Sequence, residues 1–272
     1  MDTLELKAAK LRECLGDLGR VAVAFSGGVD STLLLRVAHD TLGDQAVAFT
    51  LSLHSTPARE IEAAREFCRE HGIHQVVIEL DELAIPGFRE NPPDRCYHCK
   101  RTIFAKMLAA ADAGGFGHLV EGSNVDDLGD YRPGNRAIRE LGVKSPLLEA
   151  GFTKADVRAL SQQLGLPTWD KPSAACLASR FAYGEPITDE GLARVDAAET
   201  FLRDLGFGQA RVRVHGTLAR IEVEPERIEE LAAEPSRSKA LQRLQELGFG
   251  YITLDLVGYR TGSMNEALTN TQ

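Results

Sequence analysis

This sequence lacks the marks of a membrane or secreted protein. Its 272 residues contain no apolar run that approaches the roughly 18 residues of a membrane span. The first five residues, MDTLE, are acidic and do not begin an apolar secretory signal. Five cysteines, an odd number, suit a reducing compartment better than a disulfide framework. We therefore expect a cytoplasmic protein that does not bind membranes.

Basic tracts are also missing. Lysine and arginine together number 31 against 40 aspartates and glutamates, which gives a net charge of −9. A surface that binds nucleic acid tightly is usually basic, so no nucleic-acid partner is expected. The hydrophobic content of 43% is ample for a core, and the length suits one large or two modest domains.

A loop of small residues at positions 26–31, SGGVDS, is the strongest functional signal. An apolar run precedes it, and an apolar stripe with helical spacing follows it. The order strand, turn, helix leaves backbone N–H groups at a helix N-terminus that can bind an anion. Gly27 and Gly28 let the backbone approach closely, and Ser26 and Ser31 add hydroxyl donors. The pattern predicts a phosphate site.

The loop contains no lysine, which excludes the Walker-A type of phosphate loop. Asp30 stands there instead, and a carboxylate beside phosphates makes sense mainly as a ligand of Mg²⁺. SGGVDS resembles the PP-loop of ATP pyrophosphatases, which cleave ATP between the α and β phosphates, adenylate a substrate oxygen and release pyrophosphate. The plain alternative is an ordinary Gly-Gly turn that carries serines. The resemblance implies an ATP site formed by Ser26, Gly27, Gly28, Asp30, Ser31 and Gly122.

Strands alternate with helices through the first part of the chain. This alternation predicts an α/β fold in which helices cover both faces of a mostly parallel sheet, as in the adenine nucleotide α-hydrolase-like PP-loop enzymes. Ligands of such sheets bind at the carboxyl ends of the strands, where Ser26 and Gly122 both fall. Thr153 and Asp156 are placed to form a capping box. The predicted strands cover 21–25, 45–53, 74–80 and 118–121, and the predicted helices cover 4–18, 56–71, 97–111 and 153–164.

The pattern changes near residues 181–186 and predicts a smaller α+β domain. Two alternating runs flank His215-Gly216-Thr217, which is typical of a β-hairpin. We therefore place a PP-loop domain at 1–182 and a second domain at 183–272, with a loose tail at its end. The elements predicted in the second domain are helices at 188–205, 226–233 and 238–247 and strands at 211–215, 218–223 and 251–255.

The cysteines divide by their surroundings. Cys14 lies on the first amphipathic helix and Cys68 lies beside Phe67, and both are expected to pack in the core. Cys96 and Cys99 open a helix after a proline-rich loop, where the helix N-terminus favours thiolates and the spacing lets both sulfurs share one metal or form a disulfide. Cys176 lies among small residues, and Arg180 and Lys171, which are near it in the sequence, can favour its thiolate, so we expect a reactive or metal-bound thiol.

Five motifs together resemble the LarE family of ATP-dependent sulfur transferases, which help to make the nickel-pincer nucleotide cofactor of lactate racemase. The motifs are SGGVDS, RCYHCK, EGSNVDD, DKPSAACLASR and RVRVHGTLARIEV, and the resemblance spans about residues 5–262. It implies that ATP adenylates the carboxylates of pyridinium-3,5-biscarboxylic acid mononucleotide, and that sulfur then displaces AMP to leave thiocarboxylates. It also implies a homo-oligomer, a hexamer in that family.

The family resemblance places Cys176 at the sulfur-donor position. Some members sacrifice the sulfur of a single cysteine there, whereas others hold a [4Fe–4S] cluster on three cysteines and carry an extra sulfide on the unique iron. Because this chain has Cys96 and Cys99 as well as Cys176, it resembles the cluster type. A zinc site that includes His98, a plain redox pair and a sacrificial Cys176 remain alternatives.

Arg211 and Arg213 alternate along a predicted strand, so both side chains face the same side and can bind one phosphate. A solvated strand face is the usual reading, but the resemblance assigns these arginines to the phosphate of the substrate. It also assigns Glu199 and Glu222 to acidic positions important for activity, with metal binding as one role. Two other functions fit the motifs: another PP-loop thiolase or ligase, and a non-enzymatic metal- or redox-sensing module that binds nucleotides.

Overall fold

The structure, a computed structural model, describes residues 3–128, 133–172 and 175–260. Its chain forms two compact units, each described here by itself. The first contains Met1–Ile85 and Asp94–Ala174, and the second contains Pro86–Pro93 and Ala175–Gln272. The predicted boundary between residues 182 and 183 stays a prediction, and the predicted tail at 262–272 lies outside the described residues.

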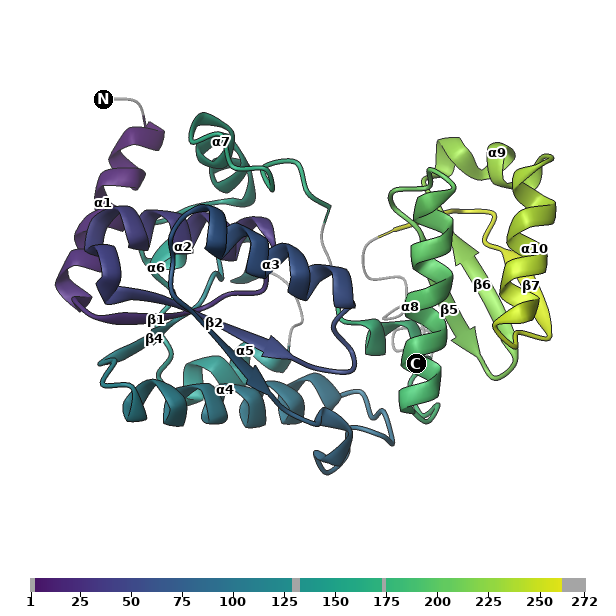
Figure 1. Ribbon diagram of the computed structural model, residues 1–272, viewed down its shortest axis with the longest axis horizontal. Helices are drawn as coiled ribbons and strands as arrows, with labels where there is room; N and C mark the ends of the chain where they lie inside the picture. Colours follow the sequence, from purple (N-terminus) through teal and green to yellow (C-terminus); the bar gives the residue numbers. More distant parts are fainter. Residues whose placement is uncertain (1–2, 129–132, 173–174, 261–272) are drawn as a thin grey trace. The chain divides into compact units, whose positions relative to one another are not determined.

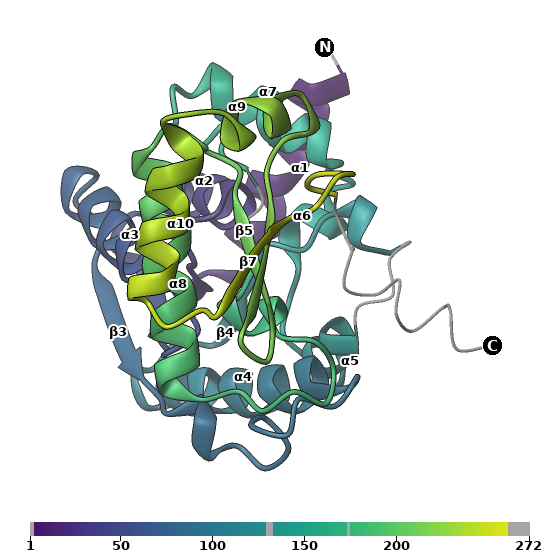
Figure 2. The same cartoon turned by 90° about the vertical axis from the view of Figure 1, so that its right-hand side faces the viewer.

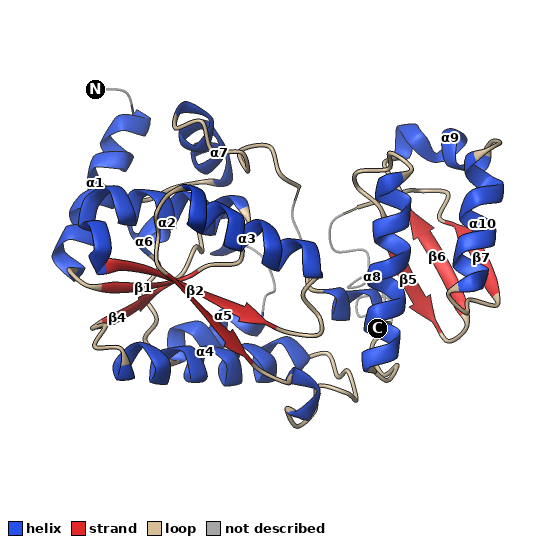
Figure 3. Ribbon diagram, in the orientation of Figure 1, coloured by secondary structure: helices blue, strands red, loops and turns tan. Residues whose placement is uncertain are grey.

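The first unit contains a four-stranded, fully parallel sheet, which confirms the predicted α/β class. Helices lie on both faces of this sheet (Figures 1 and 3). The strands of such a sheet are apolar on both faces, so helices must shield both faces from water. The strands are β1 (Val21–Ala24), β2 (Ala46–Ser52), β3 (Gln75–Glu79) and β4 (His118–Val120). The helices are α1 (Thr3–Leu18), α2 (Val29–Leu42), α3 (Ala58–Glu70), α4 (Arg95–Ala113), α5 (Pro133–Glu140), α6 (Pro146–Glu149) and α7 (Lys154–Gln163).

The strand order in this sheet is β3-β2-β1-β4. The chain runs outward from β1 through β2 to β3, and then returns to place β4 on the free side of β1. The carboxyl ends of β1 and β4 therefore border the switch point of the sheet, where open α/β sheets bind ligands. The loops after these two strands are the SGGVDS loop and the EGSNVDD loop.

The core of the first unit lies between the sheet and the layer that α1, α2 and α7 form (Figure 1). Leu11 and Leu15 of α1 and Leu33 and Leu34 of α2 are fully buried in it. The predicted capping box starts α7, because Asp156 N donates to the Thr153 side chain and the Asp156 carboxylate accepts from Thr153 N. Helix α7 is therefore held by its capping box as well as by packing.

The second unit is a smaller α+β structure, as predicted. Its sheet has the order β5-β6-β7, in which β5 and β6 form the antiparallel hairpin around Gly216 and β7 pairs with β6 in parallel. Helices α8 and α10 pack against each other beside this sheet (Figure 2). The strands are β5 (Arg211–His215), β6 (Leu218–Glu222) and β7 (Tyr251–Leu254), and the helices are α8 (Asp189–Asp204), α9 (Ile228–Ala232) and α10 (Ser236–Glu246). Among the described residues, no helix combines the length and apolarity needed to cross a lipid bilayer.

Gly122, directly after Glu121 at the end of β4, lies against the beginning of α2. A Cβ atom added to Gly122 would lie 3.0 Å from Ser31 N and 3.2 Å from the carbonyl carbon and the Cβ of Asp30. These neighbours are backbone or near-backbone atoms at the start of a helix, so they cannot rotate away as a flexible side chain would. The close approach of the two loops therefore requires glycine at position 122.

We expect Gly122→Ala to push the two loops apart. The overpacked alanine should lower the unfolding free energy by about 1–3 kcal/mol in a urea titration. Gly117→Ala is the matched control, because Gly117 precedes β4 at its other end and an added Cβ would meet nothing within 4 Å. Equal stability of both variants and the unmodified chain would contradict the packing argument.

Candidate active site

The SGGVDS loop forms the turn between β1 and α2. Helix α2 begins at Val29 after Gly28, which cannot supply a capping side chain, so the first N–H groups of the helix have no cap of their own. The Ser31 hydroxyl donates to Gly28 O at 3.1 Å and accepts from Ser26 N at 3.3 Å, and it lies 3.1 Å from the Ser26 hydroxyl. Gly27 has a φ of 71°, a conformation that favours glycine. A loop ordered in this way at an uncapped helix N-terminus can serve as an anion cradle.

Asp30, in the first turn of α2, joins three separate segments. Asn124 of the EGSNVDD loop donates to its Oδ1 at 3.0 Å, and Lys154 at the start of α7 donates to its Oδ2 at 2.5 Å. The Asp30 side chain is 24% exposed. A partly exposed carboxylate at the beginning of a helix and beside an anion cradle has the chemistry of a Mg²⁺ ligand. The structure thus brings Gly122 and the SGGVDS residues together, as expected.

The sequence did not indicate that two lysines lie at this edge of the sheet. Lys154 neutralises Asp30, and Lys171 donates to Gly27 O at 2.9 Å and to Glu60 at 2.6 Å. Proximity in sequence suggested that Lys171 acts on Cys176, but its ammonium group instead supports the SGGVDS loop. Lys171 lies in the DKPSAACLASR motif, whereas the capping box of Thr153 and Asp156 was the local signal beside Lys154.

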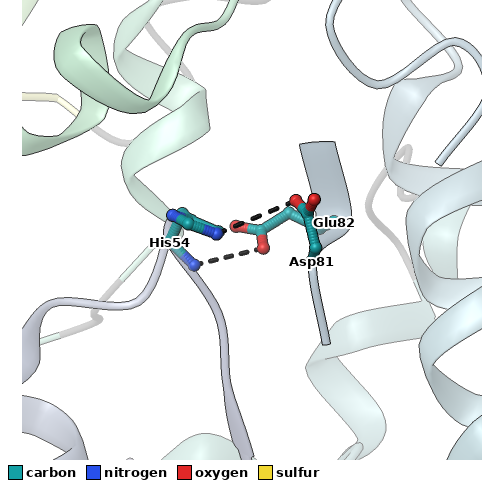
Figure 4. A group of neighbouring side chains, drawn as sticks. All are labelled: His54, Asp81 and Glu82. Atoms are coloured by element: carbon teal, nitrogen blue, oxygen red, sulfur yellow. Dashed lines mark hydrogen bonds and ion pairs between the residues drawn. The ribbon is translucent and has the colours of Figure 1, made fainter. Parts of the chain in front are cut away.

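His54, Asp81 and Glu82 are the one group of three metal-ligand-type side chains that converges in the described part of the chain (Figure 4). The Glu82 carboxylate is buried and accepts from His54 N at 3.1 Å and Ser55 N at 2.6 Å. The ring of His54 lies 3.8 Å from Asp81. Because the oxygens of Glu82 serve backbone N–H groups, this group holds the loop after β2 to the segment after β3.

Cys96 and Cys99 occupy the first turn of α4, as predicted. Cys96 is exposed and lies 3.6 Å from the Arg95 guanidinium group, and Cys99 is half-buried. His98 turns to Asp94, at 3.1 Å, and does not converge closely with the two thiols in the described structure. The chemistry of the pair fits a soft metal centre that is reachable from solvent.

Cys176 belongs to the second unit and is also exposed. It immediately precedes a short 3-10 helix, Leu177–Arg180, and the Arg180 guanidinium group donates to the carbonyl oxygens of Ala175 and Cys176. Arg180 therefore positions the backbone of Cys176.

The remaining cysteines are structural. Burial raises the pKa of Cys68 to about 12, and burial also raises the pKa of Cys14. Both thiols therefore remain protonated at neutral pH and are poor nucleophiles and metal ligands. Cys68 is buried as expected, whereas Cys14 is half-buried.

A buried cluster of arginines and carboxylates occupies the second unit. Arg180 binds Glu199 through two hydrogen bonds of 2.8 and 2.9 Å, and Glu199 also accepts from Val212 N at 3.0 Å. Burial opposes ionisation of Glu199, but the hydrogen bonds from Arg180 and the charges of Arg180 and Arg211 hold the pKa of Glu199 below its usual value. The contacts of Glu199 are those of a group that orients arginines.

The second part of the cluster lies on the β5–β6 hairpin. Arg213 donates twice to Glu222, at 2.8 and 3.1 Å, and Arg220 lies 3.3 Å from the same carboxylate. Arg220 also pairs with Asp255. In the antiparallel pair of β5 and β6, Arg211 lies opposite Glu222 and Arg213 lies opposite Arg220. These four side chains therefore lie on one face of the sheet.

The cluster carries a surplus of positive charge. Its cations are Arg180, Arg211, Arg213, Arg220 and Arg260, and its anions are Glu199, Glu222 and Asp255. Among these described residues, arginines therefore outnumber carboxylates.

An uncapped helix N-terminus, a carboxylate and two lysines at the switch point of a parallel sheet define an ATP-using enzyme of the PP-loop class. Consistent with this class, a family model described as asparagine synthase matches residues 6–107. A protein of Synechocystis sp. described as uncharacterised is 46% identical over 98% of this chain and 99% of its own length. The pyridinium-3,5-bisthiocarboxylic acid mononucleotide synthase of Lactiplantibacillus plantarum is 42% identical over 100% of this chain and 98% of its own length.

The chain belongs to the family of that synthase, the LarE family, which confirms the resemblance seen in its motifs. A tRNA-specific 2-thiouridylase of Azorhizobium caulinodans is 33% identical, but over only 57% of this chain and 49% of its own length. The similarity to the thiouridylase is therefore partial, whereas the similarity to the synthase covers both units.

We expect Glu199→Gln to lower the unfolding free energy by about 3–5 kcal/mol at pH 7, because it leaves buried guanidinium groups without their counter-charge. The folded pKa of Glu199 is depressed, so its stabilisation is present above the unfolded pKa of about 4.3 and is lost as pH falls through the folded pKa. The difference between the variant and the unmodified chain should therefore shrink below about pH 4.3. Urea titrations from pH 3.5 to 8 measure this difference.

Glu230→Gln is the control for this experiment, because Glu230 pairs with Arg227 on the exposed surface. Its unfolding free energy should follow that of the unmodified chain at every pH. A Glu199→Gln variant that behaves like Glu230→Gln would show that the buried charge of Glu199 does not stabilise the fold.

Proposed function

We propose that this chain is an ATP-dependent sulfur insertase. It adenylates the carboxylates of pyridinium-3,5-biscarboxylic acid mononucleotide, releases pyrophosphate, and converts the acyl adenylates to thiocarboxylates with loss of AMP. The observation that carries this proposal is the SGGVDS loop with Asp30 at the sheet switch point, in a chain similar over its full length to a synthase of the bisthiocarboxylic product. The acidic net charge, −9, opposes a tRNA substrate.

The first unit supplies the activating chemistry. A substrate carboxylate attacks the α-phosphorus of ATP, and negative charge builds on the departing pyrophosphate. The N–H groups at the beginning of α2 stabilise this charge. Asp30 would hold Mg²⁺, which would supply further positive charge to the phosphates. Asn124 and Lys154 orient the Asp30 carboxylate, and Gly122 allows the second loop to close on it.

The second unit binds the substrate. Arg211 and Arg213 bind the phosphate of the mononucleotide, and their position on one face of the β5–β6 hairpin, in a cluster rich in arginine, supports this role. Glu199 and Glu222 hold the arginines in place. In this proposal they act as positioning residues rather than as metal ligands, because their oxygens already accept hydrogen bonds from guanidinium and backbone N–H groups.

Cys96, Cys99 and Cys176 carry the sulfur. All three side chains are exposed or half-buried, unlike the buried Cys68, so they fit a solvent-accessible centre. Together they would hold a [4Fe–4S] cluster that leaves one iron open to supply an extra sulfide as the nucleophile. In the alternative, Cys176 gives up its own sulfur; its exposure and the backbone hydrogen bonds from Arg180 suit that role too.

The activity itself is tested by pyrophosphate release. We expect release that requires both ATP and the pyridinium dicarboxylate mononucleotide, and no release with bulk tRNA or with the same nucleotide lacking carboxylates. Asp30→Asn should lower the rate by about 10²-fold or more, because it removes the metal-binding charge. Release with tRNA but not with the mononucleotide would favour a thiouridylase, and ATP binding without AMP formation would favour a nucleotide-binding sensor.

The sulfur source is tested by anaerobic purification. We expect a brown protein with about four irons per chain. Ser substitution of Cys96, Cys99 or Cys176 should abolish the colour, whereas Cys14→Ser is the control that should keep it. A colourless anaerobic protein whose Cys176 loses one sulfur during turnover, seen by intact mass, would replace the cluster with the sacrificial mechanism.

A further inference from the structure

The arginine-bearing face of the sheet in the second unit also carries an aromatic region. Side chains on one face of a sheet repeat at every second residue, so the register of β5, β6 and β7 sorts this face into rows across the strands. One row contains Arg213 and Arg220. The next row toward the turn at Gly216 has two aromatic rings with an aliphatic side chain between them. We call it the aromatic row, and its members are His215, Leu218 and Tyr251.

Tyr251 is the most exposed member of the aromatic row that the sheet holds at its edge. It is 70% exposed, and within the described residues its ring has no hydrogen-bond partner and stacks on no other ring. Its backbone is fixed, because β7 pairs with β6 and Tyr251 N donates to Thr217 O at 3.4 Å. Single exposed apolar side chains are common on protein surfaces. The position of Tyr251 beside the arginines is what distinguishes it.

The distance between the aromatic row and the arginines suits a mononucleotide. Adjacent strands lie about 4.8 Å apart, and two residues along a strand span about 6.6 Å. Tyr251 is therefore a diagonal neighbour of Arg220, and aromatic and long side chains in such positions can reach one ligand. Arg220 is 25% exposed, and Leu218 is half-buried between the two aromatic rings. A ligand with a phosphate at one end and a flat ring at the other matches this layout.

The charges around the aromatic row favour a ring that is itself positive. The face of a phenol ring attracts cations. Burial and the charges of Arg220 and Arg213 lower the pKa of His215, so its imidazole is neutral near pH 7 and adds no positive charge to the row. The Glu185 carboxylate, which accepts from Gly216 N at 2.9 Å, supplies negative charge nearby. The arginines thus suit a phosphate, whereas the aromatic row suits a cationic ring.

We propose that the aromatic row binds the pyridinium ring of the substrate, with the face of that ring stacked on Tyr251 and its phosphate on the neighbouring arginines. This inference rests on the proposed function, because it takes the pyridinium mononucleotide as the ligand. Stacking uses the face of the ring and leaves its edge free, and both carboxylates lie at that edge. Tyr251 thereby selects a cationic ring without touching the reacting groups, which makes it a specificity-determining residue.

The test is the equilibrium binding of pyridinium-3,5-biscarboxylic acid mononucleotide to the full chain, measured by calorimetry. Mg²⁺ and α,β-methylene-ATP, which cannot be cleaved between the α and β phosphates, are present to prevent turnover. We expect Tyr251→Leu to weaken binding by about 5-fold or more, because leucine is apolar but has no aromatic face. Tyr251→Phe should stay within about 3-fold of the unmodified chain, because the face remains. Ribose 5-phosphate has the phosphate without the ring, so all three proteins should bind it alike.

Leu241→Ala is the matched control, because Leu241 is 45% exposed on α10 and lies outside the sheet. It should bind the mononucleotide within about 2-fold of the unmodified chain. Equal binding of the mononucleotide by Tyr251→Leu and the unmodified chain would overturn the inference. An equal loss in Tyr251→Phe, or an equal loss of ribose 5-phosphate binding in Tyr251→Leu, would overturn it too. Failure of the unmodified chain to bind the mononucleotide would instead overturn the proposed function.

Discussion

The carboxylate of Asp30 is the point on which the first unit depends. Asn124 and Lys154 reach it from segments that are 94 and 124 residues away in the chain. Each contact closes a long loop and carries an entropic cost, which the packed sheet and helices offset before the side chains meet. The same carboxylate that holds the loops together is the expected metal ligand, so the assembly of the fold also assembles the nucleotide site.

The second unit meets a related constraint in a different way. Buried arginines are costly unless carboxylates accompany them, and replacing such pairs by apolar residues is often neutral or stabilising. The buried arginine–glutamate pairs therefore add little stability that well-packed apolar residues in place of both partners would not. Their retention makes sense if the cluster holds guanidinium groups rigidly, with more positive than negative charge, for an anionic ligand. Glu199 and Glu222 reduce the mutual repulsion of the arginines and fix their orientation.

Local patterns predicted the local features of this chain accurately. Alternating apolar runs predicted the strands, Thr153 and Asp156 predicted the capping box, and the residues around Gly216 predicted the hairpin. The partners of these features were not predictable in the same way. Nothing near Lys154 indicates that its ammonium group meets Asp30, and nothing near Asp255 indicates that it meets Arg220, because each contact depends on strand order and helix packing. For the same reason Lys171, whose neighbours in sequence pointed to Cys176, supports the SGGVDS loop instead.

The sequence by itself determined the chemistry available to this protein: a phosphate loop without lysine, exposed thiols with spacing suited to a metal, and paired arginines on one strand. These features depend on residue type and short spacing, which the backbone geometry of a turn, helix or strand translates directly into position. Only the tertiary structure decided which charges meet. The β3-β2-β1-β4 order brings the loops after β1 and β4 together, and the β5–β6 register places Arg213 and Arg220 on one carboxylate. Electrostatic interactions act through space rather than along the chain, so they follow the fold.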